Sequence, residues 1–471
     1  MNPFDAASPF DARYYFADRA FFEKLNPYVS ENAQVAYLAR VEAALAETLA
    51  DCKVCPRKAA AEIAKAARNV KPDEVYEEER RIQHNIRALV NCIGKQVSAA
   101  AKPYVHLFAT SADIMDTARA LCLVEVTHDV IVPDLIGLEK QLIRLARAHA
   151  ATPQMGRTHG QHAVPITFGF AVALYVSRLG QRIEIIDRAA RNLRGKFAGA
   201  VGAYNALALL RPENPAALEA DLMKRLGLAA PEISSQVVQP EYVTDFVYAL
   251  ASTWGIMANL ADDFRHLQRS EIREIRDKKA ENPESEVVGS STMPHKVNPK
   301  DFENVKSLWK AYMPRLVTVL MDQVSEHQRD LTNSASSRFV TEFVTAFAYG
   351  IRRLSSTLDG IEPDVARMKE ILEGGKDPVT AEPLYVLLSL AGHADAHEEA
   401  RVLARKARAA KVPLAQLIRT DPAVKDFYAR MSPEQRAVLD DPACYLGAAA
   451  QTTRLICEDW DKRLVLLGKQ R

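Results

Sequence analysis

The sequence predicts an all-α protein whose central part is a long helical bundle. Runs of helix-forming residues, with apolar positions every three or four residues, fill the stretch from 111 to 361. Period-two patterns bounded by Asn-Gly or Asp-Gly are nearly absent, and alanine is abundant throughout. With 48% hydrophobic residues in 471, the chain has ample material for a core, and its length favours about two or three domains.

The helical patterns succeed one another in order along the chain. Shorter runs with brief breaks occupy residues 31–104, and one of them, EEERRIQHNIRALVNCIGKQVSAAA, reads as a continuous helix. Longer helices are expected over about 113–149, 167–198, 242–276, 301–327 and 335–358. Pro133 and Pro314 are expected to kink their helices rather than end them, because the apolar pattern resumes beyond each proline.

The number of long helices predicts a shared core. In the last helix, one face collects Phe343, Ala346, Phe347, Gly350, Ile351, Leu354 and Leu358. Five such helices cannot each bury a full apolar face in a thin layer, so we expect a bundle that shares part of its core with other subunits. A compositional break over 361–383 separates the bundle from the C-terminal residues. The expected domains are an N-terminal helical domain (1–110), the central bundle (111–361) and a small C-terminal helical domain (362–471).

Charge and composition exclude several classes of protein. Lys plus Arg number 61 against 60 Asp plus Glu, so no basic surface for nucleic acid is expected. No stretch approaches the roughly 18 uninterrupted apolar residues of a membrane span. The N-terminal residues lack the layout of a signal peptide, so a cytoplasmic location is expected. Cys52 and Cys55 form a single CxxC without the partners of a zinc site, which favours reduced thiols and no metal.

Several polar stretches carry residues that a structural helix does not need. Arg13, beside Tyr14 in DARYYF, offers a planar guanidinium suited to phosphate or carboxylate, although an arginine in such a stretch is more often a surface residue. His84 lies inside the helical run RRIQHNIRALV, as a packing residue or a catalyst. Thr110 and Ser111 precede a helix whose N-terminal amides could receive an anion, or they simply cap it.

Two further stretches combine histidines or arginines with turn residues. In GRTHGQHAVPITFG (156–169), His159 and His162 are separated by three positions, and no carboxylate or cysteine adjoins them in sequence. This pattern leaves a general acid–base role and a metal both open. In QRDLTNSASSRF (328–339), two arginines and several hydroxyls open a helix, which suits phosphate or a solvated cap.

The stretch GSSTMPHKVNP (289–299) interrupts the helical pattern with a glycine-led loop. The preceding segment, 279–288, is polar and contains a proline, so it is expected to be exposed and mobile. Taken alone, the loop could be no more than the entry to a helix capped by Asp301.

These motifs, in this order, resemble a known family. RTH followed by GSSTMPHKVN is similar to the signature of the fumarase/aspartase superfamily. Within it the chain resembles the adenylosuccinate lyase family over essentially its whole length. The matching segments are SPFDARY, QHN (83–85), TS (110–111), GRTHGQHAVPITFG, AGAVGAYNA (198–206), SSQVVQPEY (234–242), SSTMPHKVNPKDFEN (290–304), RDLTNSASSR (329–338) and AEPLYVLLSLAG (381–392).

The resemblance implies a reaction and a set of roles. Family members cleave a C–N bond by β-elimination and release fumarate from adenylosuccinate, or from the succinylated aminoimidazole carboxamide ribotide, without a cofactor. Ser290 maps onto the general base and His159 onto the general acid. Three subunits of a homotetramer contribute to each family active site. The remaining positions map onto groups for the succinyl carboxylates (Lys296, Asn298, Thr110, Ser111, Ser291), for the nucleotide and its phosphate (Arg13, Tyr14, Arg329, Ser334, Arg338) and for further substrate contacts (His84, Asn85, Gln236, Asn304).

Elementary electrostatics agrees with these implied roles. Removing a proton next to a carboxylate builds a dianion, so the site must concentrate positive charge and amide donors. Lys296 and the loop amides can supply both. A serine base is disfavoured in water, because each unit of pKa depression needs about 1.4 kcal/mol of preferential stabilisation of the anion. We therefore expect the 279–300 segment to be a lid that creates its base after closing over substrate.

The chain departs from the family pattern at three places, and alternatives stay open. Asn85 stands where the family usually has aspartate, TSAD carries Ala112, and 334–338 reads SASSR. A sister lyase acting on argininosuccinate, another N-succinyl compound or a carboxymuconate would leave Arg13, Arg329 and Arg338 without a phosphate to bind. A non-enzymatic role is also conceivable, but it would not need both a serine base and a histidine acid.

Overall fold

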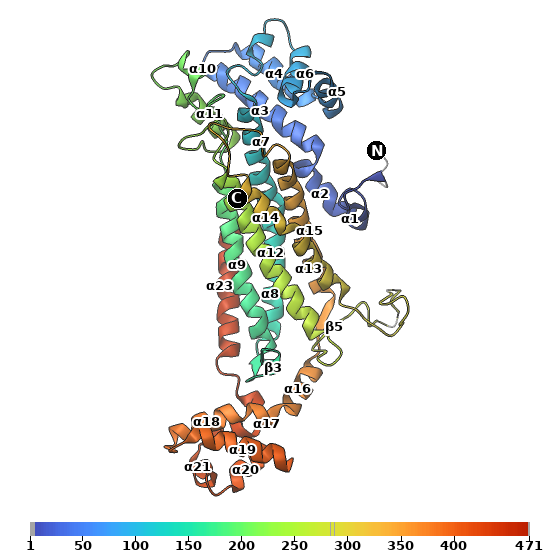
Figure 1. Cartoon of the computed structure of the whole chain (residues 1–471), viewed down its shortest axis with the longest axis vertical. Coiled ribbons are helices and arrows are strands. Elements are labelled where there is room, and N and C mark those ends of the chain that lie inside the picture. Colours follow the sequence, from blue (N-terminus) through green and yellow to red (C-terminus); the bar gives the residue numbers. More distant parts are fainter. Residues whose placement is uncertain (1–4, 283, 287, 470–471) are drawn as a thin grey trace. The chain divides into compact units, whose positions relative to one another are not determined.

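The computed structural model describes residues 5–282, 284–286 and 288–469 (Figure 1). The chain forms two compact units, each assembled from three separate segments. Unit 1 comprises the described residues up to Leu135, then Arg182–Gly255 and Ser307–Arg352. Unit 2 comprises Ile136–Gln181, Ile256–Lys306 and the described residues from Arg353 onward.

Helices dominate both units. Unit 1 holds α1 (Arg13–Ala17), α2 (Arg19–Val29), α3 (Glu31–Asp51), α4 (Arg57–Asn69), α5 (Pro72–Ile82), α6 (Asn85–Lys95), η2 (Lys102–Tyr104), α7 (Ser111–Val126), η3 (Thr127–Ile131), α10 (Asn205–Ala208), α11 (Ala216–Leu226), α14 (Pro314–Met321) and η4 (Ser336–Arg338). The unit boundaries fall inside or at the ends of α8 (Val132–Ala148), α9 (Phe168–Arg191), α12 (Glu241–Leu267), α13 (Lys300–Tyr312) and α15 (Phe339–Asp359). Unit 2 adds α16 (Val365–Gly374), α17 (Lys376–Val379), α18 (Ala381–Leu390), α19 (Ala396–Ala410), α20 (Leu414–Thr420), α21 (Lys425–Arg430), α22 (Pro433–Asp440), η5 (Pro442–Cys444) and α23 (Ala449–Lys469).

The strands are few and short, which confirms the predicted all-α class. In the described part of the chain, six strands of two or three residues form three antiparallel pairs. These pairs are β1 (Pro153–Gln154) with β4 (Ile166–Thr167), β2 (Arg157–Thr158) with β3 (Gln161–His162), and β5 (Ile275–Asp277) with β6 (Ile361–Pro363). No helix among the described residues is long and apolar enough to cross a membrane.

Both prolines lie at or beside interruptions of the helical pattern, and at Pro314 the interruption ends one helix, whereas a kink within a single helix was expected. The helix predicted from about 113 to 149 consists of α7, the π-helical turn η3 and α8, and Pro133 lies in the first turn of α8. At Pro314 the hydrogen-bond ladder breaks, because proline has no N–H, so α13 ends at Tyr312 and α14 begins with the proline. Met313 between them keeps helical dihedral angles, with φ −55° and ψ −37°.

Four sequence-based predictions about helix extent were wrong. The run that contains His84 is not one helix, because Gln83 adopts a left-handed conformation (φ 58°) and ends α5 before α6 begins. The helix expected to reach residue 198 stops at Arg191. The helix expected to reach residue 327 stops at Met321, and the one expected to reach 276 stops at Leu267. Beyond Met321 and Leu267 polar segments run on without the regular apolar spacing that a buried helix requires.

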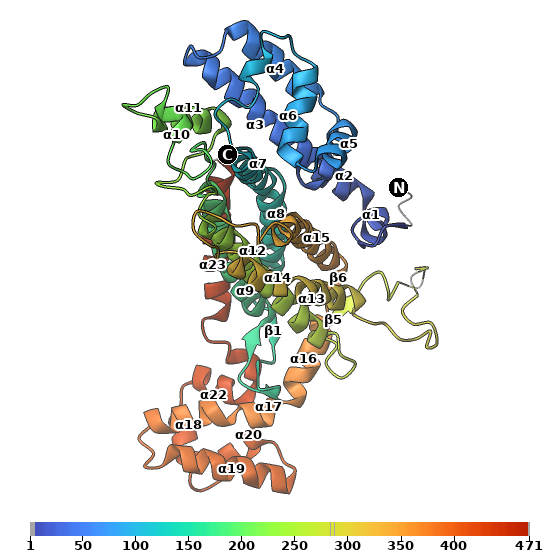
Figure 2. The ribbon, with the colours of Figure 1, turned by 45° about the horizontal axis from the view of Figure 1, so that its top comes forward.

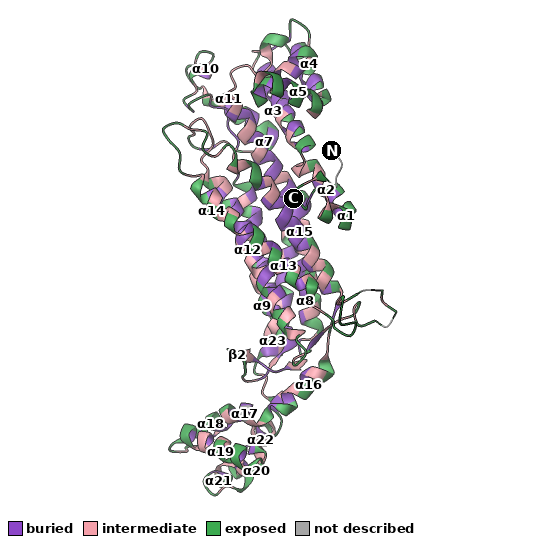
Figure 3. Ribbon diagram, turned by 45° about the vertical axis from the view of Figure 1, so that its right-hand side comes forward, coloured by how far each residue is buried: buried purple, intermediate pink, exposed green. Residues whose placement is uncertain are grey.

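The core of unit 1 joins α3, α4, α6, α7 and α11, and Figure 2 shows α3, α4 and α6 side by side. A second, aromatic cluster surrounds Trp254, which is fully buried. Its indole stacks on Tyr312 at 6.0 Å and meets Phe343 and Phe347 edge-on, each at 5.7 Å between ring centroids. The apolar face predicted for the last long helix is thus buried, as Figure 3 also shows for α15.

Unit 2 contains a small helical core of its own near the C-terminal end. Leu384 and Leu388 of α18, Leu403 of α19, and Leu414 and Ile418 of α20 are fully buried within it. Both α18 and α19 show this inner face in Figure 3, with exposed residues on the opposite side. A separate cluster of Met155, Leu372 and Val379 packs α16 against the strand β1.

Candidate active site

The proposed acid, His159, lies at the tip of the β2–β3 hairpin in unit 2. His159 and Gly160 form its two-residue turn, with φ values of 55° and 73°. Positive φ at both central positions is characteristic of a type I′ turn, which matches the twist of the two strands. A left-handed conformation strains a histidine, and such strain persists only where the surroundings impose it. The turn exposes the imidazole, whereas His162 lies on the adjoining strand.

A buried ion pair fixes this hairpin. Glu274 is fully buried, and Arg157 of β2 donates to it through Nη2 at 2.7 Å and Nη1 at 3.1 Å. Gln154 of β1 donates a further hydrogen bond to Glu274 at 2.7 Å. Because bidentate, charge-assisted bonds fix orientation as well as distance, Glu274 anchors the strand that ends just before His159.

The proposed base, Ser290, lies in a loop of unit 2 that closes on itself. Its Oγ accepts hydrogen bonds from the backbone N–H groups of Met293 (3.1 Å) and Thr292 (3.4 Å). Backbone donors aimed at an oxygen stabilise negative charge on it, which is the property that a serine base needs.

The same loop gathers two further predicted residues. The side-chain amide of Asn298 donates to the Gly289 carbonyl at 2.9 Å, and the Lys296 carbonyl lies so close to Gly289 that a Cβ there would be 2.3 Å from it. Ser290, Lys296 and Asn298 are therefore held in one compact turn, with Ser291 and Lys296 exposed. The expected lid, 279–300, includes residues 283 and 287, which lie outside the described residues.

Asn304 lies in the second turn of α13. Its Oδ1 is buried without a hydrogen-bond partner among the described residues, although it stands four positions after the exposed Lys300. A buried acceptor that lacks a donor is costly, so this oxygen is available to a ligand.

In unit 1 the starts of α6 and α7 meet. Thr110 and Ser111 open α7, and the backbone N–H of Thr110 donates to the Asp113 side chain at 2.8 Å. Asn85 begins α6 and donates through Nδ2 to the sulfur of Met115 on α7 at 3.4 Å. His84, instead of lying within a helix, caps α6 by accepting from the Arg87 N–H at 3.2 Å. These residues thus lie at the N-terminal ends of the two helices, where the helix dipoles favour anions.

Gln236 and Arg329 belong to adjoining segments of unit 1. The backbone N–H of Gln236 donates to the Gln328 carbonyl at 3.2 Å, next to Arg329. Two residues further on, the Val238 N–H donates to Asp116 of α7 at 2.9 Å. The 234–239 segment therefore lies between α7 and the arginine-bearing segment.

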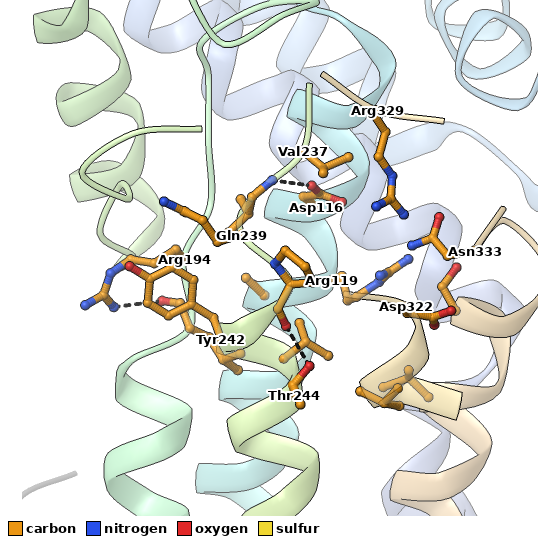
Figure 4. Close-up of a pocket in the computed structure, with 18 residues that line it drawn as sticks. Asp116, Arg119, Arg194, Val237, Gln239, Tyr242, Thr244, Asp322, Arg329 and Asn333 are labelled. Carbon is orange, nitrogen blue, oxygen red and sulfur yellow. Dashed lines mark hydrogen bonds between the residues drawn. The ribbon is translucent and has the colours of Figure 1, made fainter. Parts of the chain in front are cut away.

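Arg329 lines a pocket in which other charged residues converge (Figure 4). Its guanidinium and that of Arg119 point toward the same space, beside Asp116, Asp322 and Asn333. Burial raises the pKa of Asp116, and the two arginines act in the opposite direction. Sequence reasoning missed Arg119, because it stands on a regular helix without a turn or a glycine beside it.

The other proposed nucleotide contacts lie at separate places within unit 1. Arg13 begins α1 and is exposed, while the Tyr14 ring packs on Tyr349 at 4.9 Å between centroids. Ser334 and Arg338 are exposed in the segment that forms η4. Arg338 lies near enough to α5 for its charge to oppose the upward shift that burial imposes on the pKa of Tyr76.

A second residue of chemical interest, His106, was also missed. His106 lies four positions before Thr110, has a positive φ of 60°, and its Nδ1 is 2.6 Å from Oε1 of the buried Glu42. The sequence places a histidine and a phenylalanine shortly before TS. These residue types do not reveal that His106 and Phe108 both adopt a left-handed backbone conformation.

Comparisons with known proteins identify the family. A family model described as lyase matches residues 12–310, and one described as adenylosuccinate lyase C-terminal matches residues 325–435. The chain is 32% identical to adenylosuccinate lyase from Pyrococcus horikoshii, over 96% of this chain and 98% of that protein. It is 34% identical to the Pyrococcus abyssi adenylosuccinate lyase, over 85% and 87% respectively.

A solved structure of an enzyme with another activity shares the fold. The 3-carboxy-cis,cis-muconate lactonizing enzyme from Pseudomonas putida superposes with a TM-score of 0.80 and 26% identity, covering 95% of this chain and 98% of that one. Similarity of this extent covers both units rather than a single motif. The chain therefore belongs to the lyase family and, within it, to the adenylosuccinate lyases.

Proposed function

We propose that this protein cleaves adenylosuccinate into AMP and fumarate, and the succinylated aminoimidazole carboxamide ribotide into its amide and fumarate. The observation that carries the proposal is the 289–298 loop, which holds a serine, a lysine and an asparagine together in a chain of this family. A succinyl group presents two carboxylates and an acidic C–H, and this loop offers a cation, amide donors and a base.

In the proposed reaction, Ser290 removes a proton from the β-carbon of the succinyl group. The electron pair left on that carbon forms the double bond of fumarate as the C–N bond breaks. His159 gives a proton to the departing nitrogen, so one proton leaves carbon, one reaches nitrogen, and no oxidant or cofactor enters. Lys296 balances the charge that accumulates on the carboxylate during proton removal.

The substrate contacts divide into three groups of residues. Lys296, Asn298, Ser291, Thr110 and Ser111 serve the succinyl carboxylates. Arg13, Tyr14, Arg329, Ser334 and Arg338 serve the nucleotide and its phosphate, a role that suits guanidinium groups. His84, Asn85, Gln236 and Asn304 serve the rest of the substrate.

Ser290→Ala and His159→Gln test the two chemical roles. Each variant should lose turnover of adenylosuccinate by about 10²–10⁴-fold or more, because each removes one proton-transfer group. Far-UV circular dichroism should be unchanged, since neither side chain is buried. Chromatography of AMP and fumarate measures the products. Full activity of Ser290→Ala would show that another group is the base.

We also propose that the protein works as a homotetramer. Support comes from α14, where Val317, Leu320, Met321 and the following Val324 leave one apolar helix face exposed to solvent. Exposed apolar stripes of this kind mark association surfaces. Sedimentation tests this proposal, and a monomer at micromolar concentration would reject it. The six free thiols suit the reducing cytoplasm, where we place the enzyme.

A second candidate is a lyase acting on another N-succinyl compound, such as argininosuccinate. Asn85 favours it, because the amide carries no charge at a position near the proposed nucleotide site. Assaying both substrates side by side separates the two proposals: release of fumarate from argininosuccinate alone would support the second.

A further inference from the structure

A lysine and an aspartate are buried together in the middle of unit 1. Lys196 and Asp113 both have fully buried side chains, and the Lys196 Nζ forms an ion pair with the Asp113 Oδ1. The same ammonium donates to the Gly199 carbonyl at 3.2 Å. The two residues are 83 positions apart in the sequence, so the pair joins segments that have no local reason to be adjacent.

Asp113 also accepts hydrogen bonds from backbone N–H groups of two segments. Its carboxylate accepts from the Thr110 N–H at 2.8 Å, at the start of α7. It also accepts from the backbone N–H groups of Ala198 (3.1 Å) and Gly199 (3.3 Å). One carboxylate therefore ties the first turn of α7 to the 196–199 segment.

Gly202, three residues after the 196–199 segment, packs against the backbone next to another proposed substrate contact. Gly202, with φ 76°, approaches the 234–236 segment so closely that a Cβ would lie 2.1 Å from the Ser234 carbonyl and 2.6 Å from that of Ser235. Ser235 immediately precedes Gln236. The segment cannot shift here without moving the backbone beside Gln236.

A second carboxylate steadies the same segment from the other side. Glu219 of α11 is almost fully buried and accepts from the Phe197 N–H at 2.7 Å and from the Tyr204 hydroxyl at 2.6 Å. The stretch 196–204 is thus held by buried carboxylates at both flanks, with glycines in left-handed conformations at 199 and 202. A displacement at one end of this stretch is therefore passed on to its other end, because the backbone between them is held in place.

Stability alone does not account for a buried ion pair. Removing two charges from water costs free energy that their attraction only partly returns, and an apolar pair of similar volume is often as stable. What an ion pair adds is fixed geometry, because its charge-assisted hydrogen bonds constrain the orientation of both groups as well as their distance.

We propose that Asp113 and Lys196 form a positioning pair that sets Thr110 and Ser111 in register with Gln236, and so aligns the substrate. The inference deepens the proposed function and rests on it for the identity of the substrate. The pair touches no substrate atom; it acts through the two segments that do.

The test removes both charges together. Asp113→Asn/Lys196→Met keeps similar side-chain volumes and leaves no unpaired charge. The matched control is Asp134→Asn/Lys24→Met, which removes another lysine–aspartate pair in unit 1 (3.0 Å) that lies at least ten positions from every proposed contact in the sequence. Should the first variant fail to fold, Lys196→Arg keeps the charge and alters only the geometry.

Two readouts distinguish positioning from a general structural role. The KM for adenylosuccinate should rise about tenfold or more in the variant and stay within about twofold in the control, because misplaced contacts weaken binding. Amide hydrogen exchange should accelerate in 109–112 and 234–239 of the variant but not in α3. Unchanged KM and exchange would overturn the proposal, and so would exchange that accelerates equally in α3.

The exchange readout needs no substrate. If the wild-type protein does not cleave adenylosuccinate, the proposed function fails, while exchange in the two segments still decides whether the pair positions them. Selective acceleration would then uphold the positioning role for another substrate, and its absence would reject it.

Discussion

Replacing Glu274 tests how the hairpin that carries His159 is held. In Glu274→Ala, Arg157 loses two hydrogen bonds to a carboxylate, and Gln154 loses one. Glu274 is fully buried and Arg157 has 18% of its side chain exposed, so the orphaned guanidinium recovers only part of its hydration.

The expected cost can be worked from these contacts. Removing one partner of a buried ion pair destabilises a protein by about 3–5 kcal/mol, and the partial exposure of Arg157 favours the lower end, about 3 kcal/mol. At about 2.1 cal/mol/K per residue, a chain of 471 residues has an unfolding entropy of about 1 kcal/mol/K. The melting temperature should therefore fall by about 3 °C in a thermal scan followed by circular dichroism.

Activity should fall more steeply than stability. Once Arg157 is released, the turn at His159 and Gly160 loses the anchor that holds its strained dihedral angles. A displacement of about 1 Å in a catalytic group can reduce turnover by about 10²-fold, so kcat should drop by about that factor at temperatures where the variant is folded.

The control for this experiment lies on the neighbouring strand pair. Arg276 and Glu362 form an ion pair at 3.2 Å across β5 and β6, with 35% and 52% of their side chains exposed. Glu362→Gln should cost at most about 1 kcal/mol and leave kcat unchanged, because exposed pairs contribute little. If Glu274→Ala behaved like Glu362→Gln in both measurements, the anchoring role would be refuted; a loss of stability with normal kcat would refute only the positioning of His159.

Three further perturbations each act on a single contact or group. Gly289→Ala should lower kcat by about 10²-fold with an intact fold, since the new Cβ would collide with the Lys296 carbonyl; steady-state kinetics would show it, and normal kcat would contradict the closed loop. Hydrogen bonds, of which the one from Arg81 has the largest effect, lower the pKa of Glu78 to about 2. The stability that this carboxylate adds to the folded protein is therefore complete above the unfolded pKa of 4.5 and is lost as pH falls toward 2. Urea unfolding should show the gap between wild type and Glu78→Gln closing over that window, and a gap independent of pH would disprove it. Asn85→Asp should raise kcat/KM for adenylosuccinate by about fivefold, equivalent to about 1 kcal/mol, because a carboxylate accepts stronger hydrogen bonds; an unchanged ratio would make Asn85 irrelevant to substrate choice.

The helical framework could be predicted because its signal is local. In α15 the apolar positions recur every three or four residues, and Phe343, Phe347, Ile351 and Leu354 are buried as that spacing requires. The break between α5 and α6 could not be predicted in this way. It depends on Gln83 adopting a left-handed conformation, for which glutamine carries no local signal.

Sequence motifs propose the residues of the candidate site, whereas their arrangement depends on the fold. The motif at 289–299 identified Ser290 and Lys296, yet the role of the Asn298 amide in closing the loop on Gly289 depends on the folded backbone. The strands around His159 are two residues long, too short for an alternating pattern to reveal a hairpin.

The least predictable features share a physical cause. Arg157 and Glu274 are 117 positions apart, and Asp113 and Lys196 are 83 positions apart, so neither pair leaves a periodic trace in the sequence. Each pair is buried, and each holds a segment that carries a proposed substrate or catalytic residue. Apolar residues in these places would pack the core about as well, but they would not fix the orientation of a loop. Loss of either pair should therefore lower kcat more than a substitution in the bundle that destabilises the protein by the same amount. The bundle tolerates small shifts that an active-site turn does not.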